Sequence, residues 1–217
     1  VDLGMFSKNS LFYKYFRRKE ECLYKVSDYI GCMSPANVDF VLAHNTFLSS
    51  QKVEIAPNSI TLVKESEVDK CAIRKEYGLP VDKPIFIYGG NLGKPQGVDF
   101  LLECLRENIN RNDCFFLVVG SGTEFGKLQK WFSHAKPSNA SLLAGLPKEK
   151  YDVLVRSCDV GLIFLDYRFT IPNYPSRLLS YLQYRMPVIA ATDEHTDVGT
   201  IAEAQGYGCW CRSNDVR

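Results

Sequence analysis

Four glycines and a lysine lie close together in "YGGNLGKPQGVDF", residues 88–100, between an apolar run and an amphipathic one. Because glycine has no Cβ, a bound group can approach the backbone closely at such residues. A helix starting at Gly97 presents free N–H groups and a partial positive charge of about half a unit. Lys94 adds a full charge. The segment therefore predicts a phosphate-binding loop formed by Gly90, Asn91, Gly93 and Lys94.

This glycine spacing matches neither G-x-G-x-x-G nor G-x-x-x-x-G-K-[ST]. A dinucleotide-binding dehydrogenase would also carry an acidic residue about 20 positions later, whereas the next apolar run ends in "VVGSG", residues 118–122. A purely structural strand-to-helix turn remains the alternative to a phosphate site.

A second charged helix start follows at Pro175, Ser176 and Arg177. Ser176 is predicted to cap this helix, and Arg177 can bind a phosphate through two donors. The alternative is an ordinary cap beside a surface arginine. Because ligands of open α/β sheets bind beyond the carboxyl ends of the strands, both helix starts are expected at one sheet edge. Lys94 and Arg177 together predict a nucleotide-diphosphate site in a common pocket.

From about residue 84 onward, short apolar runs alternate with amphipathic runs. Helices are expected to begin near Gly97, Thr123, Lys148, Ser176 and Gly199. The strands are expected within residues 84–89, 114–120, 141–145, 160–165, 187–192 and 208–211. Uniformly apolar strands that alternate with helices indicate an α/β fold, a Rossmann-like parallel sheet with helices on both faces.

Residues 1–62 have a different pattern. Helices are expected over 11–26 and 35–45, the second opened by a proline, and strands within 28–34 and 52–60. Four elements are too few for a core of their own, so they are interpreted as the last elements of an incomplete N-terminal domain. Residues 63–84 predict a linker and a short helix that stops at Gly78. The chain is expected to be a piece of a longer protein.

Composition excludes several classes of function. With 26 basic and 25 acidic residues, the chain has no broad polyanion-binding surface, and nucleic acid is not expected as a partner. Its eight cysteines and three histidines lack zinc-like spacing. Buried, reduced thiols and a cytoplasmic location are expected. The sequence contains neither a signal peptide nor an apolar run of the ~20 residues that a membrane span needs.

The order of these motifs resembles that of the group 1 retaining glycosyltransferases, which have the GT-B fold of two Rossmann-like domains. "IFIYGGNLGKPQGVDFLLECL", "FFLVVGSGTEFGKLQKW" and "PSRLLSYLQYRMPVIAATD" follow in the family's order and spacing. Especially similar is the subgroup of capsule, O-antigen and exopolysaccharide synthesis. It carries a Gly-Asn-x-Gly-Lys-x-Gln-Gly loop and a Pro-Ser-Lys/Arg-Leu helix start.

This resemblance implies that residues 63–217 bind a nucleotide-sugar donor, with UDP as the expected nucleotide. It places the diphosphate between the first loop and Ser176 with Arg177, and the ribose near Ser180. The base is expected near Gly120, Gly122, Gly145, Leu146 and Pro147.

Retaining transfer without a metal or cofactor is implied, to a glycan or lipid-linked acceptor held by the absent domain. Helix 11–26 could contact the inner membrane face peripherally. The piece alone is expected to be inactive.

The sequence departs from the family at two places. Asn91 and Gln96 stand where many members have a basic pair, and Pro172 and Ser180 stand where a pair of glutamates is usual. The catalytic residues therefore stay unassigned. A UDP-sugar 2-epimerase and a non-catalytic nucleotide-sugar-binding module remain as alternative functions.

Overall fold

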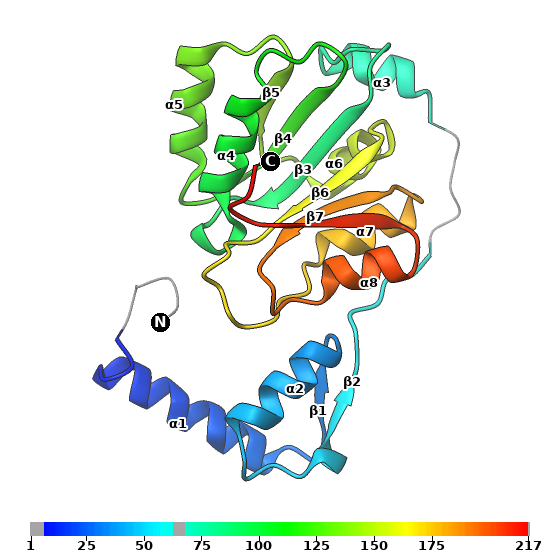
Figure 1. Ribbon diagram of the computed structural model, residues 1–217. Helices are drawn as coiled ribbons and strands as arrows, with labels where there is room; N and C mark the ends of the chain where they lie inside the picture. The colour runs from blue at the N-terminus through cyan, green and yellow to red at the C-terminus, as the bar shows by residue number, and fades with distance from the viewer. Residues whose placement is uncertain (1–6, 63–67, 217) are drawn as a thin grey trace.

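The structure, a computed structural model, describes residues 7–62 and 68–216 and contains two separate parallel sheets (Figure 1). The smaller sheet pairs β1 (Ile30–Cys32) with β2 (Val53–Ile55). The larger has the order β5-β4-β3-β6-β7-β8, and every neighbouring pair is parallel. Its strands are β3 (Ile85–Asn91), β4 (Phe115–Ser121), β5 (Ala140–Ala144), β6 (Val160–Phe164), β7 (Val188–Thr192) and β8 (Gly208–Arg212). The predicted Rossmann-like sheet is confirmed.

Helices cover both faces of the larger sheet because its central strands are apolar on both sides. Ile85 and Ile87 of β3 belong to one core, while Phe86 and Tyr88 belong to the other. The first core lies against α3 (Lys70–Glu76), α6 (Lys148–Arg156), α7 (Arg177–Gln183) and α8 (Val198–Ala204). The second lies against α4 (Val98–Glu107) and α5 (Phe125–Ala135).

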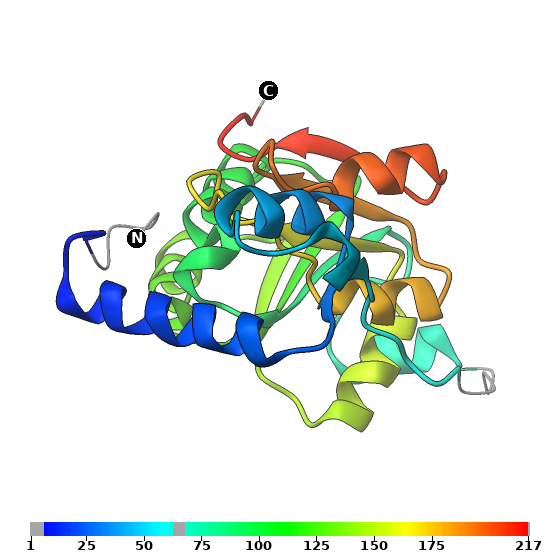
Figure 2. The same cartoon turned by 90° about the horizontal axis from the view of Figure 1, so that it is seen from below.

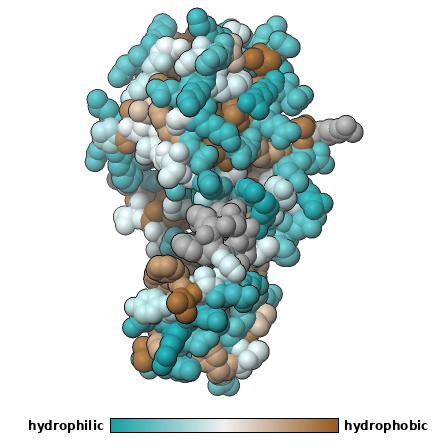
Figure 3. Space-filling model, turned by 90° about the vertical axis from the view of Figure 1, so that its left-hand side faces the viewer, coloured by the Kyte–Doolittle hydropathy of each residue, from teal (hydrophilic) through white to brown (hydrophobic). Residues whose placement is uncertain are grey.

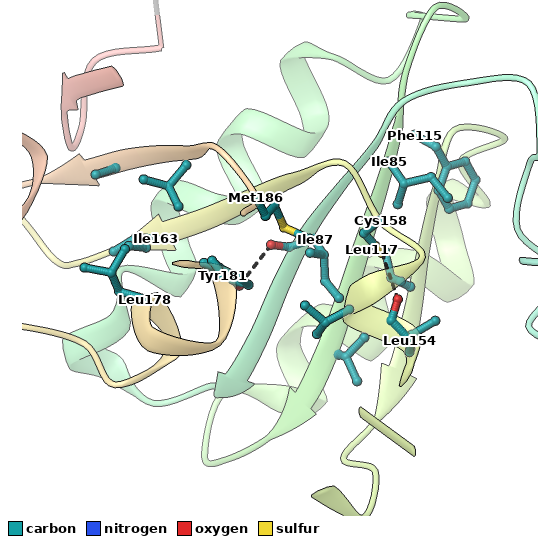
Figure 4. Close-up of a cluster of buried hydrophobic side chains, with 14 of the residues drawn as sticks. Ile85, Ile87, Phe115, Leu117, Leu154, Cys158, Ile163, Leu178, Tyr181 and Met186 are labelled. Atoms are coloured by element: carbon teal, nitrogen blue, oxygen red, sulfur yellow. Dashed lines mark hydrogen bonds between the residues drawn. The ribbon is translucent and has the colours of Figure 1, made fainter. Parts of the chain in front are cut away.

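Tyr181 fixes α7 at the middle of the sheet (Figure 4). Its side chain is fully buried, and its hydroxyl lies 3.2 Å from the Ile87 carbonyl of β3 and 3.4 Å from the Leu162 carbonyl of β6. The ring packs on Gly161, where any Cβ would collide with it. Burial raises the pKa of Tyr181 to about 12, so the hydroxyl stays protonated as a donor. The start of α7 is thereby held over the neighbouring strands β3 and β6.

The short helix α3 packs on the larger sheet through a buried arginine. Arg74 Nη2 lies 2.6 Å from Asp159 Oδ2, which also accepts a 2.8 Å hydrogen bond from the Ile85 amide. The other guanidinium nitrogens donate to the carbonyls of Ser157, at 2.8 Å, and Lys83, at 3.1 Å. The predicted helix that ends before Gly78 is thus part of the larger unit. The predicted domain boundary, between residues 62 and 63, borders residues 63–67, which lie outside the described residues, and it stays a prediction.

The smaller unit consists of α1 (Leu11–Val26), α2 (Pro35–His44), the short η1 turn (Ser50–Lys52) and the two-stranded sheet. Seen from below, this unit lies in front of the larger unit (Figure 2). Helix α1 buries none of its residues. Figure 3 shows hydrophobic surface on this unit, seen from the side of α1 and α5. Of the residues that are described, no helix combines the length and apolar character that crossing a bilayer requires.

The expectation that the cysteines are buried holds for Cys32, Cys114 and Cys158 and is wrong for three others. Cys22 lies on α1, which has no buried residue, Cys71 lies in the first turn of α3, and Cys209 lies on the edge strand β8. An apolar neighbourhood in sequence therefore did not guarantee burial where the element lies at a surface or an edge.

Truncating the buried side of α7 should destabilise the larger unit. Leu178 is 1% exposed, and Leu178→Ala is expected to lower the free energy of unfolding by about 2–5 kcal/mol through lost burial and a residual cavity. Leu182, on the same helix but 37% exposed, is the matched control, and Leu182→Ala should cost less than about 1 kcal/mol. Urea unfolding followed by circular dichroism measures both; equal losses would contradict the placement of α7.

Candidate functional site

A cavity of about 530 Å³ lies at the carboxyl end of β3, beside the loop that leads into α7. Strand order reverses here, because the chain runs from β3 outward to β4 and β5 and then returns to β6 on the other side. Such a switch point is where open α/β sheets bind ligands. The cavity is lined by Asn58, Gly89, Gly90, Asn91, Gln96, Tyr151, Asn173, Tyr174, Pro175, Ser176, Arg177 and Ser180.

Arg177 is the cation of this cavity, and two contacts hold its guanidinium. Nη2 donates to Gln96 Oε1 at 2.6 Å, and Cζ lies 4.2 Å from the centroid of the Tyr88 ring. The Tyr88 hydroxyl donates to the Asn91 carbonyl at 2.8 Å, and burial raises its pKa, so the ring stays neutral beneath the cation. Arg177 Nη1 is buried and has no hydrogen-bond partner among the described residues. A buried charged donor without a partner is unusual and costly.

Gly90 gives the end of β3 a shape that only glycine adopts without strain. Its φ is 124°, and a Cβ there would lie 3.7 Å from the Arg177 guanidinium carbon. The main chain of the loop therefore faces the guanidinium without an intervening side chain. The approach of a phosphate to this loop, which the sequence predicted, stays a prediction.

Tyr151 of α6 forms another wall of the cavity. Its hydroxyl occupies the space where a Cβ on Gly89 would lie, so the strand must carry glycine at that position. The hydroxyl is buried without a hydrogen-bond partner among the described residues, and burial raises its pKa. It is therefore a neutral polar group beside the cavity rather than a base.

Ser176 lines the cavity but does not cap α7, so the predicted role as a cap is wrong. Its backbone already has helical angles, φ −61° and ψ −23°, and its side chain makes no capping hydrogen bond. A capping side chain reaches the helix N–H groups from a residue with extended backbone angles. Ser180, one turn further along α7, lies on the same wall.

Lys94 does not line the cavity that contains Arg177. It borders a separate hollow together with Asp99, Glu124, Lys127, Asp166 and Arg168, where Lys127 pairs with Asp99 and Arg168 with Asp166. Lys94 begins the short η2 helix (Lys94–Gln96), whose tight turn directs Gln96, two residues later, to the cavity instead. The expectation that Lys94 and Arg177 share one pocket is not met. The prediction from the sequence that Lys94 contacts a diphosphate is tested by the Lys94→Ala variant.

The glycines predicted near the base are placed by packing beside the first loop. A Cβ on Gly120 would collide with the Gly90 carbonyl, and one on Gly122 would lie 2.6 Å from the Leu92 carbonyl oxygen. Gly93 lies against the Asn91 side chain. The remaining predicted positions lie beyond the ends of β4 and β5 and do not line the cavity: Gly145, exposed; Leu146, packed on the core; and Pro147, exposed. Their contact with a base remains a prediction.

Seven residues of the cavity lining had no predicted binding role: Asn58, Gly89, Gln96, Tyr151, Asn173, Tyr174 and Pro175. Gln96 was noted only as a departure from a basic pair, yet it is the hydrogen-bond partner of Arg177. Asn58 follows β2 in the smaller unit, and Tyr151 comes from α6, so both reach the cavity through tertiary packing. For Gln96 the sequence did hold a signal. A neutral side chain stands there in place of the usual basic residue, and such a side chain can accept a hydrogen bond from a nearby cation.

Comparison with known proteins assigns the family. A model of the glycosyl transferases group 1 matches residues 69–216, which is the larger unit from the end of the linker onward. The chain belongs to the group 1 glycosyltransferases.

Two relatives of this group 1 chain have names that mention glycosyl transfer. "Putative colanic acid biosynthesis glycosyl transferase WcaI" of Escherichia coli K12 is 25% identical over 144 residues, 65% of this chain and 34% of that protein. "Probable glycosyltransferase WbjE" of Pseudomonas aeruginosa is 20% identical over 223 residues, 99% of this chain and 53% of that protein. The chain thus spans about half or less of the length of these relatives.

Solved structures show the same fold. WaaG, a glycosyltransferase involved in lipopolysaccharide biosynthesis, has a TM-score of 0.71 at 14% identity, over 95% of this chain and 56% of its own. Anabaena Alr3699/HepE in complex with UDP and glucose also has a TM-score of 0.71, at 15% identity, over 100% of this chain and 57% of its own. The larger unit therefore has the architecture of the corresponding part of GT-B glycosyltransferases.

Adding a side chain at Gly90 should destabilise the loop beside the cavity. Gly90→Ala places a Cβ at a φ of 124°, so the free energy of unfolding is expected to fall by about 1–3 kcal/mol. Gly126→Ala is the matched control, because its Cβ meets no atom within 4 Å and its φ is not positive; it should be neutral or stabilising by up to about 1 kcal/mol. Urea unfolding of both variants checks the difference, and a stabilising Gly90→Ala would refute the loop conformation.

Proposed function

We propose that this group 1 glycosyltransferase chain binds the diphosphate of a nucleotide-sugar donor in the cavity at the end of β3, with UDP as the nucleotide. The observation that carries the proposal is Arg177, a cation held in the cavity wall by Gln96 and Tyr88, with one buried nitrogen still unpaired. A phosphate oxygen is a strong partner for guanidinium donors.

The chemical role of the site is electrostatic. Glycosyl transfer from a nucleotide sugar leaves negative charge on the departing diphosphate, and a preorganised cation next to it stabilises that charge as it develops. The hydroxyl groups of Ser176, Tyr151 and Ser180 and the side-chain amide of Asn91 line the same cavity and add neutral polar groups. We propose transfer with retention of anomeric configuration and without a metal, to a glycan or lipid-linked acceptor in surface polysaccharide synthesis.

We propose that the remaining steps of the reaction need groups other than those that line this cavity. Among the described residues, those lining the cavity include no aspartate and no glutamate. A UDP-sugar 2-epimerase needs acidic and basic groups around the sugar, so this lining disfavours that alternative. It is compatible with a non-catalytic nucleotide-sugar-binding module. We expect donor binding but no transfer by this chain alone, and we propose a cytoplasmic location, with α1 in peripheral contact with the membrane.

Binding of UDP tests the proposal directly. UDP should raise the melting temperature of the chain, and Arg177→Ala should weaken UDP binding by about tenfold or more, because a charge-assisted hydrogen bond contributes roughly 1.5–3 kcal/mol. Differential scanning fluorimetry detects the shift, and isothermal titration calorimetry measures the affinity.

Lys94→Ala removes the same charge from the neighbouring hollow and serves as the matched control. It should change the affinity for UDP by less than about twofold, because Lys94 borders a different hollow. If Lys94→Ala weakens binding as much as Arg177→Ala does, the diphosphate is bound between the two, as the sequence alone predicted. Absence of any shift with UDP or another nucleoside diphosphate would refute the proposed function.

A further inference from the structure

Helix α2 of the smaller unit makes two hydrogen bonds with loops of the larger unit. The Ala36 amide donates to Asp197 Oδ2 at 3.0 Å, and Asn37 Nδ2 donates to the Pro172 carbonyl at 2.6 Å. The two donors are adjacent in the first turn of α2. They contact two loops that are separated by more than a helix and a strand in the sequence.

These two loops are also bonded to each other. The Asn173 amide lies 3.3 Å from Thr196 Oγ1, and that hydroxyl donates to Asp193 Oδ2 at 2.8 Å. Asp193 Oδ1 in turn accepts the amides of His195 and Thr196. Asp193 is 2% exposed and its oxygens are engaged within its own turn, so this turn is a rigid support. The contacts therefore form a closed set: α2 bonds to residues 172–173, these bond to residues 193–197, and residue 197 bonds to α2.

One side of this closed set of contacts is the wall of the cavity. Asn173, Tyr174 and Pro175 line it, and only Ser176 separates them from Arg177. From the smaller unit, Asn58 lines the same cavity. A displacement of α2 would therefore pull on the Pro172 carbonyl and move the wall next to Arg177.

Asp197 contributes charge as well as geometry. It precedes α8 without capping it by its side chain, and its Oδ2 instead faces the first turn of α2, where the helix dipole favours an anion. Its Oδ1 is buried and has no hydrogen-bond partner in the described part of the chain. Asp197 is half-buried, and among the described residues its carboxylate accepts a hydrogen bond from an amide of the smaller unit, which favours a fixed placement of the two units.

We propose that Asn37 and Asp197 are positioning residues that hold the 172–175 wall of the donor cavity from the smaller unit. The inference rests on the proposed binding of a nucleotide diphosphate in that cavity. Asn37 acts through the Pro172 carbonyl, and Asp197 acts by fixing the first turn of α2. Neither residue lines the cavity itself.

Isosteric variants separate this role from simple packing. Asn37→Asp keeps the shape but cannot donate to a carbonyl, whereas Asp197→Asn keeps an oxygen that accepts the Ala36 amide. Asn37→Asp and Asp197→Ala should each weaken UDP binding about three- to tenfold in calorimetry. Asp197→Asn should remain within about twofold of the unmodified chain. Asp39→Ala, at an exposed position of α2, is the control for loss of an aspartate and should also remain within about twofold.

Hydrogen exchange gives a readout that does not depend on UDP. Peptides covering residues 170–176 should exchange faster in Asn37→Asp than in the unmodified chain, while the strands of the larger sheet exchange at unchanged rates. If Asn37→Asp does not fold, Asp197→Ala takes its place in both measurements.

The outcomes distinguish this inference from the proposed function. Unchanged exchange and unchanged affinity in Asn37→Asp would overturn the positioning role while UDP binding stands. Faster exchange with unchanged affinity would overturn it as well, because the wall would then not matter for the donor. If the unmodified chain does not bind UDP, the proposed function fails, and exchange alone decides whether Asn37 holds the loop.

Discussion

Seating of Tyr181 between β3 and β6 is the constraint on which the candidate site depends. Gly161 leaves room for the ring. The carbonyls of Ile87 and Leu162, on the two strands that flank the switch point, accept hydrogen bonds from the hydroxyl. Because α7 is only seven residues long, the position of Tyr181 determines the position of Arg177 one turn earlier. The guanidinium then meets Tyr88, Gln96 and the glycine loop of β3. A core contact thus sets the geometry of a surface cavity.

Most of the fold follows from the sequence because the strands are apolar on both faces. Ile85, Phe86, Ile87 and Tyr88 alternate between two cores, and such runs are typical of strands in the middle of a covered parallel sheet. The helix from residue 11 to residue 26 and the one opened by Pro35 were predicted at the bounds the structure has, give or take a residue, since proline and polar cap residues mark helix starts.

The site was only partly predictable, because it depends on local backbone geometry. The sequence indicated that the loop at Gly90 and the helix start at Arg177 lie at one sheet edge, and the structure brings both to one cavity. It could not indicate that the tight η2 turn places Gln96 at the cavity and Lys94 at a separate hollow. Nor could it indicate that the backbone of Ser176 already has helical angles. Tyr151 and Asn58 reach the cavity from distant elements, and pairwise packing of that kind has no local signal.

The exposed thiols have a practical consequence. Cys22 lies on the smaller unit, and Cys71 lies on the larger one, both free and accessible to solvent. Thiol-reactive fluorophores can therefore be attached to each unit without introducing new cysteines, once exposed Cys209 is replaced. The same accessibility exposes these sulfurs to oxidation and to covalent cross-linking between copies in air, so reductant is required during purification.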